Sequence, residues 1–164
     1  MSGDTNLLNF IYQNVQMGKT TIPQLIASCE DTSCSHKDCR HGDFKAALQS
    51  QLDEYETIGC EASRLLERRG QSPDGLGAMA KMSSYVMTEM KTMRDSSVSH
   101  MAEMMIQGNT MGETTLLRHL RSHTKSDETG SVHGHRDVDE EVQKLGEKLL
   151  NTLRSNTEEM KKYL

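Results

Sequence analysis

The chain has 164 residues, of which 26% are charged, and a formal net charge of −5. A chain of this length can bury a substantial core within one domain. The charges are of mixed sign and form no basic stripe, so we expect no nucleic-acid partner. No apolar run is long enough to cross a membrane, and the first residues do not resemble a secretory signal. We therefore expect no membrane association and a cytoplasmic location.

Apolar residues recur at steps of three and four along most of the chain, which is the spacing of one helical face. This spacing predicts five helices, at about residues 5–29, 43–69, 76–94, 98–121 and 137–163. Polar stretches without such spacing predict loops at residues 30–42 and 122–136. No strand pattern competes with the helical one. The sequence therefore predicts a single all-α domain over residues 1–164.

Capping and turn residues mark where several of these helices begin or end. Asp4 or Thr5 is the expected N-cap of the first helix, and Asp43 is the expected N-cap of the second. Gly70 is expected to end the second helix. Residues 95–97 (DSS) are expected to cap the fourth helix, which then begins at residue 98.

Two further features concern how the helices are interrupted and joined. Pro23 has no N–H to donate to the carbonyl of Lys19, so we expect a kink or a short break near residues 20–23. The third helix, at 76–94, is shorter than the others and lies between the second and the fourth. It is placed to be a crossover helix in an antiparallel bundle of the four long ones.

Three stretches of the predicted helices carry a resemblance to known proteins: residues 12–20 (YQNVQMGKT), 51–55 (QLDEY) and 100–112 (HMAEMMIQGNTMG). They resemble the ferritin-like bundle proteins of small bacterial families that have no assigned activity. The resemblance covers almost the whole chain apart from the two polar loops. It implies a ferritin-like antiparallel four-helix bundle, and it implies no particular reaction.

The glutamate ligands of the ferritin-like iron site are missing from the chain. That site needs inward glutamates on two helices and a Glu-x-x-His motif on the other two. No Glu-x-x-His occurs: Glu54 is followed three residues later by Thr57, and Glu103 by Ile106. The first helix contains no glutamate before Glu30. The sequence therefore predicts that no carboxylate-bridged di-iron site forms.

A group of soft ligands follows the first helix. Three cysteines and two histidines could surround zinc or another thiophilic metal: Cys29, Cys34, His36, Cys39 and His41. Their spacing matches no standard zinc knuckle or ribbon, so a solvated loop with incidental thiols is the alternative. Cys60 follows Ile58 by two positions in the second predicted helix. It is expected to be a small buried or half-buried hydrophobic residue.

Polar residues at inward positions predict a buried network of amides and a hydroxyl. The expected members are Gln51, Tyr55, Gln107 and Asn109. Gly18, Gly108 and Gly112 would let the backbones approach closely near it. Such a network could form a small polar pocket or could fix the register of the helices, and we favour the second interpretation.

The third and fourth predicted helices are rich in methionine, which is usually core filler at helical spacing. Where such residues are exposed together they indicate an interface, so we expect a homo-oligomer, with a dimer as the first candidate. The sequence favours a non-catalytic ferritin-like bundle that acts by self-association or by binding a partner. One alternative is a metal-binding or metal-sensing protein that uses the loop at 29–41; another is an atypical oxidoreductase of the ferritin class. No catalytic residue or certain cofactor is assigned.

Overall fold

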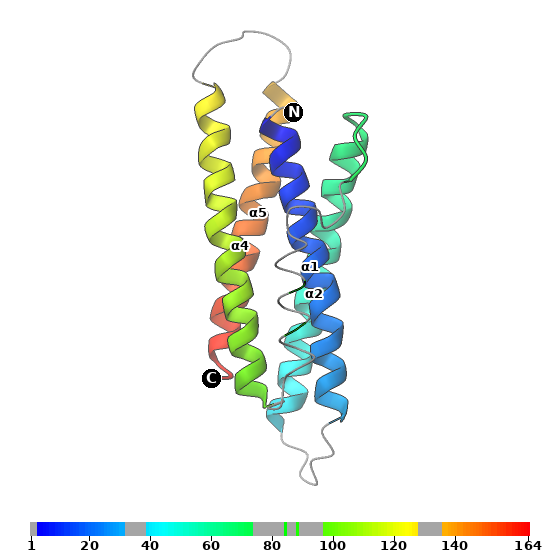
Figure 1. Ribbon diagram of the computed structural model, residues 1–164, viewed down its shortest axis with the longest axis vertical. Coiled ribbons are helices and arrows are strands. Elements are labelled where there is room, and N and C mark those ends of the chain that lie inside the picture. The colour runs from blue at the N-terminus through cyan, green and yellow to red at the C-terminus, as the bar shows by residue number, and fades with distance from the viewer. Residues whose placement is uncertain (1–2, 32–38, 74–83, 85–87, 89–96, 128–135) are drawn as a thin grey trace.

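The computed structural model is an all-α bundle whose long axis follows the helices (Figure 1). It describes residues 3–31, 39–73, 84, 88, 97–127 and 136–164, and no strand occurs in these ranges. The all-α prediction is therefore confirmed for this part of the chain. Four long helices make up the bundle: α1 (Gly3–Asp31), α2 (Cys39–Glu67), α4 (Val98–Asp127) and α5 (Arg136–Lys161).

The four helices form two antiparallel pairs, α1 with α2 and α4 with α5, and each pair packs more extensively than any other combination. The pairs then lie side by side, so that α1 is next to α4 and α2 is next to α5. Contacts at the helix ends fix their directions. The Arg69 guanidinium, after α2, lies 3.6 Å from the Asp4 carboxylate at the start of α1. Cys29 Sγ, near the end of α1, lies 4.0 Å from Met101 Sδ near the start of α4.

Because α2 and α4 run in the same direction, the end of α2 and the start of α4 lie at opposite ends of the bundle (Figure 1), and residues 68–97 separate them in sequence. The predicted third helix, at 76–94, falls in this segment. Of its residues only Ser84 and Thr88 are described; both are helical, and the Thr88 hydroxyl donates to the Ser84 carbonyl at 2.8 Å. The remainder of this predicted helix lies outside the described residues.

The core is made by apolar side chains that recur at helical spacing on all four helices. Its largest members are fully buried and come mostly from α1 and α2: Phe44, Leu7, Leu8, Ile11, Ile22, Leu25, Leu48, Ile58, Leu65, Leu66, Met101 and Leu116. Most of these residues follow the steps of three and four from which the helices are predicted. Several buried positions are nevertheless polar, among them Asn14, Gln51, Asn109 and Asn156, and these polar positions define the site described below.

The helices extend further into the predicted loops than apolar spacing indicates. α1 continues to Asp31 and α2 already begins at Cys39, so the loop predicted at 30–42 is too long. The loop predicted at 122–136 is also too long, because α4 runs to Asp127 and α5 begins at Arg136. Apolar spacing shows where a helix packs against its neighbours. The helix can continue beyond that point through polar residues that face solvent, because its backbone hydrogen bonds do not depend on apolar side chains. For the same reason Asp43 lies inside α2, and its prediction as an N-cap is wrong.

Pro23 does not break α1, which is continuous from Gly3 to Asp31 (Figure 1). The proline ring is exposed, whereas Ile22 and Leu25 on either side of it are fully buried. Their packing holds the helix together where one backbone hydrogen bond is lost. The Gln24 side-chain amide also donates to the Thr20 carbonyl at 3.0 Å, one turn back. The short break expected near residues 20–23 is therefore wrong.

Two predicted helix ends are confirmed. The Ser97 hydroxyl accepts a hydrogen bond from the His100 N–H at 3.2 Å, which is the geometry of an N-cap. At the end of α2, Gly70 has a φ of 68°. The Gln71 N–H donates to the Leu66 carbonyl at 3.0 Å and the Gly70 N–H donates to the Glu67 carbonyl at 2.9 Å. This pair of bonds is a Schellman motif, which requires a left-handed residue at the position of Gly70.

Replacing Gly70 with alanine is expected to lower the free energy of unfolding by about 1 kcal/mol, because a Cβ disfavours the left-handed conformation. Urea denaturation followed by circular dichroism measures the change. Gly42→Ala is the matched control, since Gly42 lies in α2 at a negative φ and an added Cβ meets nothing within 4 Å. An equal loss in both variants would contradict the capping role.

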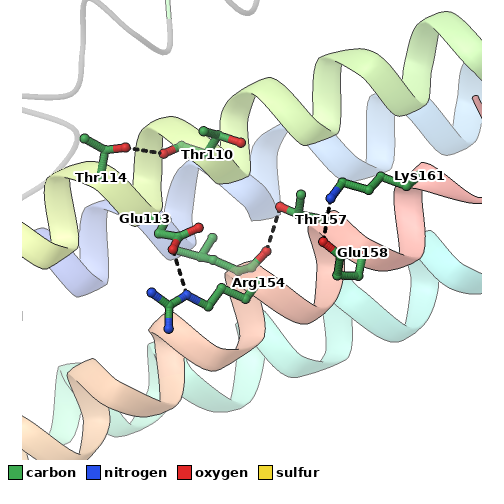
Figure 2. Close-up of polar contacts among 8 residues, drawn as sticks. Thr110, Glu113, Thr114, Arg154, Thr157, Glu158 and Lys161 are labelled. Carbon is green, nitrogen blue, oxygen red and sulfur yellow. Dashed lines mark hydrogen bonds and ion pairs between the residues drawn. The ribbon is translucent and has the colours of Figure 1, made fainter.

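Exposed ion pairs also connect neighbouring helices. Figure 2 shows Arg154 of α5 reaching across to Glu113 of α4, with Nε donating to Oε1 at 2.7 Å. On the other side of the bundle Lys148 of α5 lies 3.2 Å from Glu61 of α2. Pairs this exposed contribute at most about 1 kcal/mol each, so the buried seams carry most of the stability.

Candidate functional site

A pocket of about 150 Å³ opens on the side of the bundle where α1 lies next to α4, and all four helices contribute to its lining. Its floor consists of the buried residues Asn14, Tyr55, Asn109 and Leu153. Two buried methionines, Met17 of α1 and Met105 of α4, form its walls. The volume is about that of an engineered protein cavity that binds benzene, so the pocket suits a molecule with a single ring.

The rim of the pocket is a stripe along α4 that lies outside the core seam. It consists of His100, Glu103, Met104, Gln107 and Met111. Gln107 and Glu103 are exposed, and Met111 has 43% of its surface exposed. The predicted burial of Gln107 is therefore wrong. Successive residues of a helix are separated by about 100°, so position 107 points away from the inward positions 105 and 109.

A hydrogen bond between two buried side chains crosses the floor. The Tyr55 hydroxyl donates to Asn109 Oδ1 at 3.0 Å, and the two residues are only 3% and 4% exposed. Burial raises the pKa of Tyr55 to about 12, and this effect outweighs an opposite one from the neighbouring Asn156 amide. The phenol therefore keeps its proton at neutral pH and acts as a hydrogen-bond donor.

Three buried polar atoms in the described part of the chain have no hydrogen-bond partner. They are Gln51 Oε1, Asn109 Nδ2 and Asn156 Nδ2. A buried polar atom without a partner costs about 1–3 kcal/mol, and native proteins contain few of them. Asn109 and Asn156 come from neighbouring helices and both lie beside the Tyr55 phenol. Of the three residues only Asn109 also lines the pocket.

The predicted network is therefore divided into two parts. Tyr55 and Asn109 are bonded to each other as expected. Gln51 is buried as predicted, but its Nε2 donates to Glu159 Oε2 at 3.0 Å, on the side where α2 faces α5. Asn156 was not among the predicted members. Its spacing of three and seven residues after Leu153 and Leu149, both in the α5 seam, is the signal that places it inward.

Two glycines bring the helix backbones close to the polar floor. A Cβ built on Gly18 would lie 2.9 Å from two carbons of the Tyr55 ring, and one on Gly112 would lie 2.7 Å from Asn14 Nδ2. The close approach predicted at these two positions is confirmed. Gly108 differs, because a Cβ there meets nothing within 4 Å. The close approach predicted at Gly108 is therefore wrong. Because Gly108 lines the pocket and has no side chain, it leaves the pocket open.

The variants Gly18→Ala and Gly108→Ala are expected to change stability in opposite directions. Gly18→Ala forces a methyl group against the buried Tyr55 ring. The free energy of unfolding should fall by about 1–2 kcal/mol, even after the better helix propensity of alanine is taken into account. Gly108→Ala adds a methyl group in open space and should gain about 0.5–1 kcal/mol. Thermal and urea unfolding of both variants measures the difference. Stabilisation by Gly18→Ala would contradict the packing described here.

The predicted metal ligands are described only in part. Cys29 is half-buried near Met101, as an apolar contact of α1 would be, and His41 is half-buried in the first turn of α2. Cys39 begins α2, while Cys34 and His36 lie outside the described residues. Over the ranges that are described, no group of three His, Cys, Asp or Glu residues is placed to hold a metal ion. The five-residue metal site stays a prediction.

Cys60 is exposed, so its predicted burial is wrong. It follows the buried Ile58 by two positions, and this separation puts the two side chains on opposite faces of α2. Cys60 is a free thiol.

None of the described helices combines the length and the apolar character needed to cross a membrane. Comparison with known proteins adds no relative: no family model, no curated protein and no solved structure matches this chain.

Proposed function

We propose that the protein is a non-catalytic helical bundle that acts by binding, and that the α1–α4 pocket holds a small organic molecule. One observation carries this proposal: Asn109, buried in the pocket floor, has an amide nitrogen without a hydrogen-bond partner. A buried donor without a partner lowers the stability of the empty protein. A ligand in the pocket that accepts a hydrogen bond from this donor would remove that cost. Gly108 supports the same interpretation, because any side chain there would narrow the opening.

A variant that fills the mouth of the pocket tests this function. Gly108→Leu places four carbons beside the opening, with no clash of the Cβ. Benzene and cyclohexanone serve as probes, and amide NMR spectra report where each binds. In the wild type we expect shifts at Asn14, Gly18 and Asn109 that saturate at millimolar probe, and we expect their loss in Gly108→Leu.

Gly42→Leu is the matched control, because Gly42 is equally open but lies in the first turn of α2, away from the pocket. This variant should bind both probes as the wild type does. Absence of saturable shifts with either ring, or equal shifts in Gly108→Leu and the wild type, would overturn the proposed function.

The proposal includes a ferritin-like topology. Two antiparallel helix pairs joined by a connection that runs the length of the bundle are typical of that class. The end contacts between α1 and α2, and between α1 and α4, support this assignment. Pairs of spin labels can test it in a variant whose four native cysteines, Cys29, Cys34, Cys39 and Cys60, are replaced by serine. A label at the N-terminal end of α2 should lie close to one at the N-terminal end of α4, and the same should hold at the C-terminal ends, whereas antiparallel helices would hold both pairs about a helix length apart.

Self-association as a dimer is also part of the proposal, and it is supported by the exposure of Met111 on the rim. Sedimentation at several protein concentrations measures the mass in solution. A mass of one chain at all concentrations would contradict the dimer and would leave the pocket proposal intact.

A further inference from the structure

The floor of the pocket combines hydrogen-bonding groups with an absence of charge. Asn14, Tyr55 and Asn109 are the polar residues of the floor, and all three are neutral at neutral pH, because asparagine does not ionise and the pKa of Tyr55 is about 12. Charged side chains of the described lining occur only at the rim, where Glu103 is exposed and lies 3.8 Å from His100. The floor therefore offers no cation to an anionic ligand.

The direction of the existing hydrogen bond decides which partner the floor lacks. The Tyr55 hydroxyl donates to Asn109 Oδ1, so the acceptor of the Asn109 amide is already used. The group that has no partner is Asn109 Nδ2, which can only donate. A ligand that completes this floor must therefore carry an acceptor, such as a carbonyl oxygen.

The remaining surface of the pocket is apolar and adaptable. Met17 and Met105 form the walls, Leu153 closes the floor, and Met104 and Met111 border the mouth. Methionine side chains bend around irregular shapes and make favourable contacts with ring edges. This adaptability is needed, because Asn109 Nδ2 is closed to solvent and a ligand reaches it only after a neighbouring side chain moves.

We infer that the ligand of this pocket is a neutral, single-ring compound whose carbonyl oxygen accepts a hydrogen bond from Asn109 Nδ2. A carboxylate of the same size is excluded from the floor, because it would lose its hydration without gaining a cation. This inference rests on the proposed function and adds to it the chemical class of the ligand.

The experiment compares three probes of similar size: cyclohexanone, methylenecyclohexane, which replaces the carbonyl oxygen with a CH₂ group, and cyclopentanecarboxylate. Asn109→Leu alone would free the Tyr55 hydroxyl to donate to the ketone in place of the amide. Because the two neutral probes also differ in hydrophobicity, each affinity ratio is measured in Tyr55→Phe and in Tyr55→Phe/Asn109→Leu. We expect the preference for ketone over alkene to fall about tenfold from the single to the double variant, the effect of one hydrogen bond. Cyclopentanecarboxylate should bind at least about tenfold more weakly than cyclohexanone.

A second measurement needs only the wild-type protein. The infrared carbonyl stretch of bound cyclohexanone should lie below its position in hexane, as a hydrogen-bonded carbonyl requires. An unshifted stretch, an unchanged ratio between Tyr55→Phe and a folded Tyr55→Phe/Asn109→Leu, or tight binding of the carboxylate would overturn the inference about ligand class. Failure of the proposed function would look different. In that case benzene and cyclohexanone would give no saturable shifts, or would give the same shifts in Gly108→Leu as in the wild type.

Discussion

Replacing Asn109 with aspartate is expected to lower the free energy of unfolding by about 3 kcal/mol at neutral pH and by much less near pH 4. Aspartate has nearly the shape of asparagine, so the packing of the floor is preserved while a charge is introduced. The site is buried and the floor carries no cation, so the pKa of the new carboxyl should rise well above its ordinary value of about 3.9. Each unit of that rise corresponds to about 1.4 kcal/mol.

The sign of the pH dependence follows from proton linkage. Below about pH 4 the carboxyl is protonated in both the folded and the unfolded chain, so little stability is lost. As the pH rises the unfolded chain releases its proton first, and stability falls until the folded carboxyl also ionises. Urea denaturation of the variant at several pH values measures this loss. Asn151→Asp, at an exposed position of α5, is the matched control, and a loss of equal size there would contradict the burial argument.

Alkaline pH should remove about 2–3 kcal/mol of stability through Tyr55 alone. Its pKa is about 12 in the folded protein, against 10 for an unperturbed tyrosine, because burial disfavours the phenolate. A group with a raised pKa stabilises the fold below the unfolded value, and this contribution is lost as pH rises from about 10 to about 12. The shift of about 2 units gives the stated magnitude.

Tyr55→Phe isolates this contribution. At neutral pH the variant should be less stable than the wild type by about 1–2 kcal/mol, because Asn109 Oδ1 loses its donor. Since phenylalanine does not ionise, the difference between the two proteins should shrink or change sign above about pH 10. The effect of Tyr163, whose pKa is also raised by burial, cancels because this residue is present in both proteins. A stability difference that stays constant from about pH 8 to about pH 11 would show that the phenol is not buried as described.

The fold was predictable because apolar spacing is a local property of the chain. The seam of α2 through Phe44, Leu48, Tyr55 and Ile58 is buried throughout, as its spacing indicates. The same spacing argument would have placed Gln107 outward, between the inward positions 105 and 109. The prediction of Gln107 as an inward residue departs from this spacing, and the exposure of its side chain shows that the spacing is correct.

The site was less predictable than the fold, because it depends on which helices become neighbours. That Tyr55 meets Asn109 follows from the packing of α2 against α4 across the bundle, over 54 positions of sequence. Gln51, one helical turn before Tyr55, meets Glu159 of α5 instead. A difference of one turn thus directs two buried side chains of the same helix to different partners, and no pattern within α2 alone predicts which partner each one meets. Gly18 and Gly112 were recognisable as contact points, although the side chains that contact them were not.

The pairing of the helices has a consequence for how the molecule opens. α1 with α2, and α4 with α5, are neighbours in sequence, so each hairpin can form from local contacts before the two associate. The pocket lies on the seam between these hairpins. Partial unfolding that separates one hairpin from the other would expose the pocket without melting either hairpin. Hydrogen exchange should then detect a common opening free energy for the α1 and α4 amides that border the pocket, and occupation of the pocket should slow that exchange.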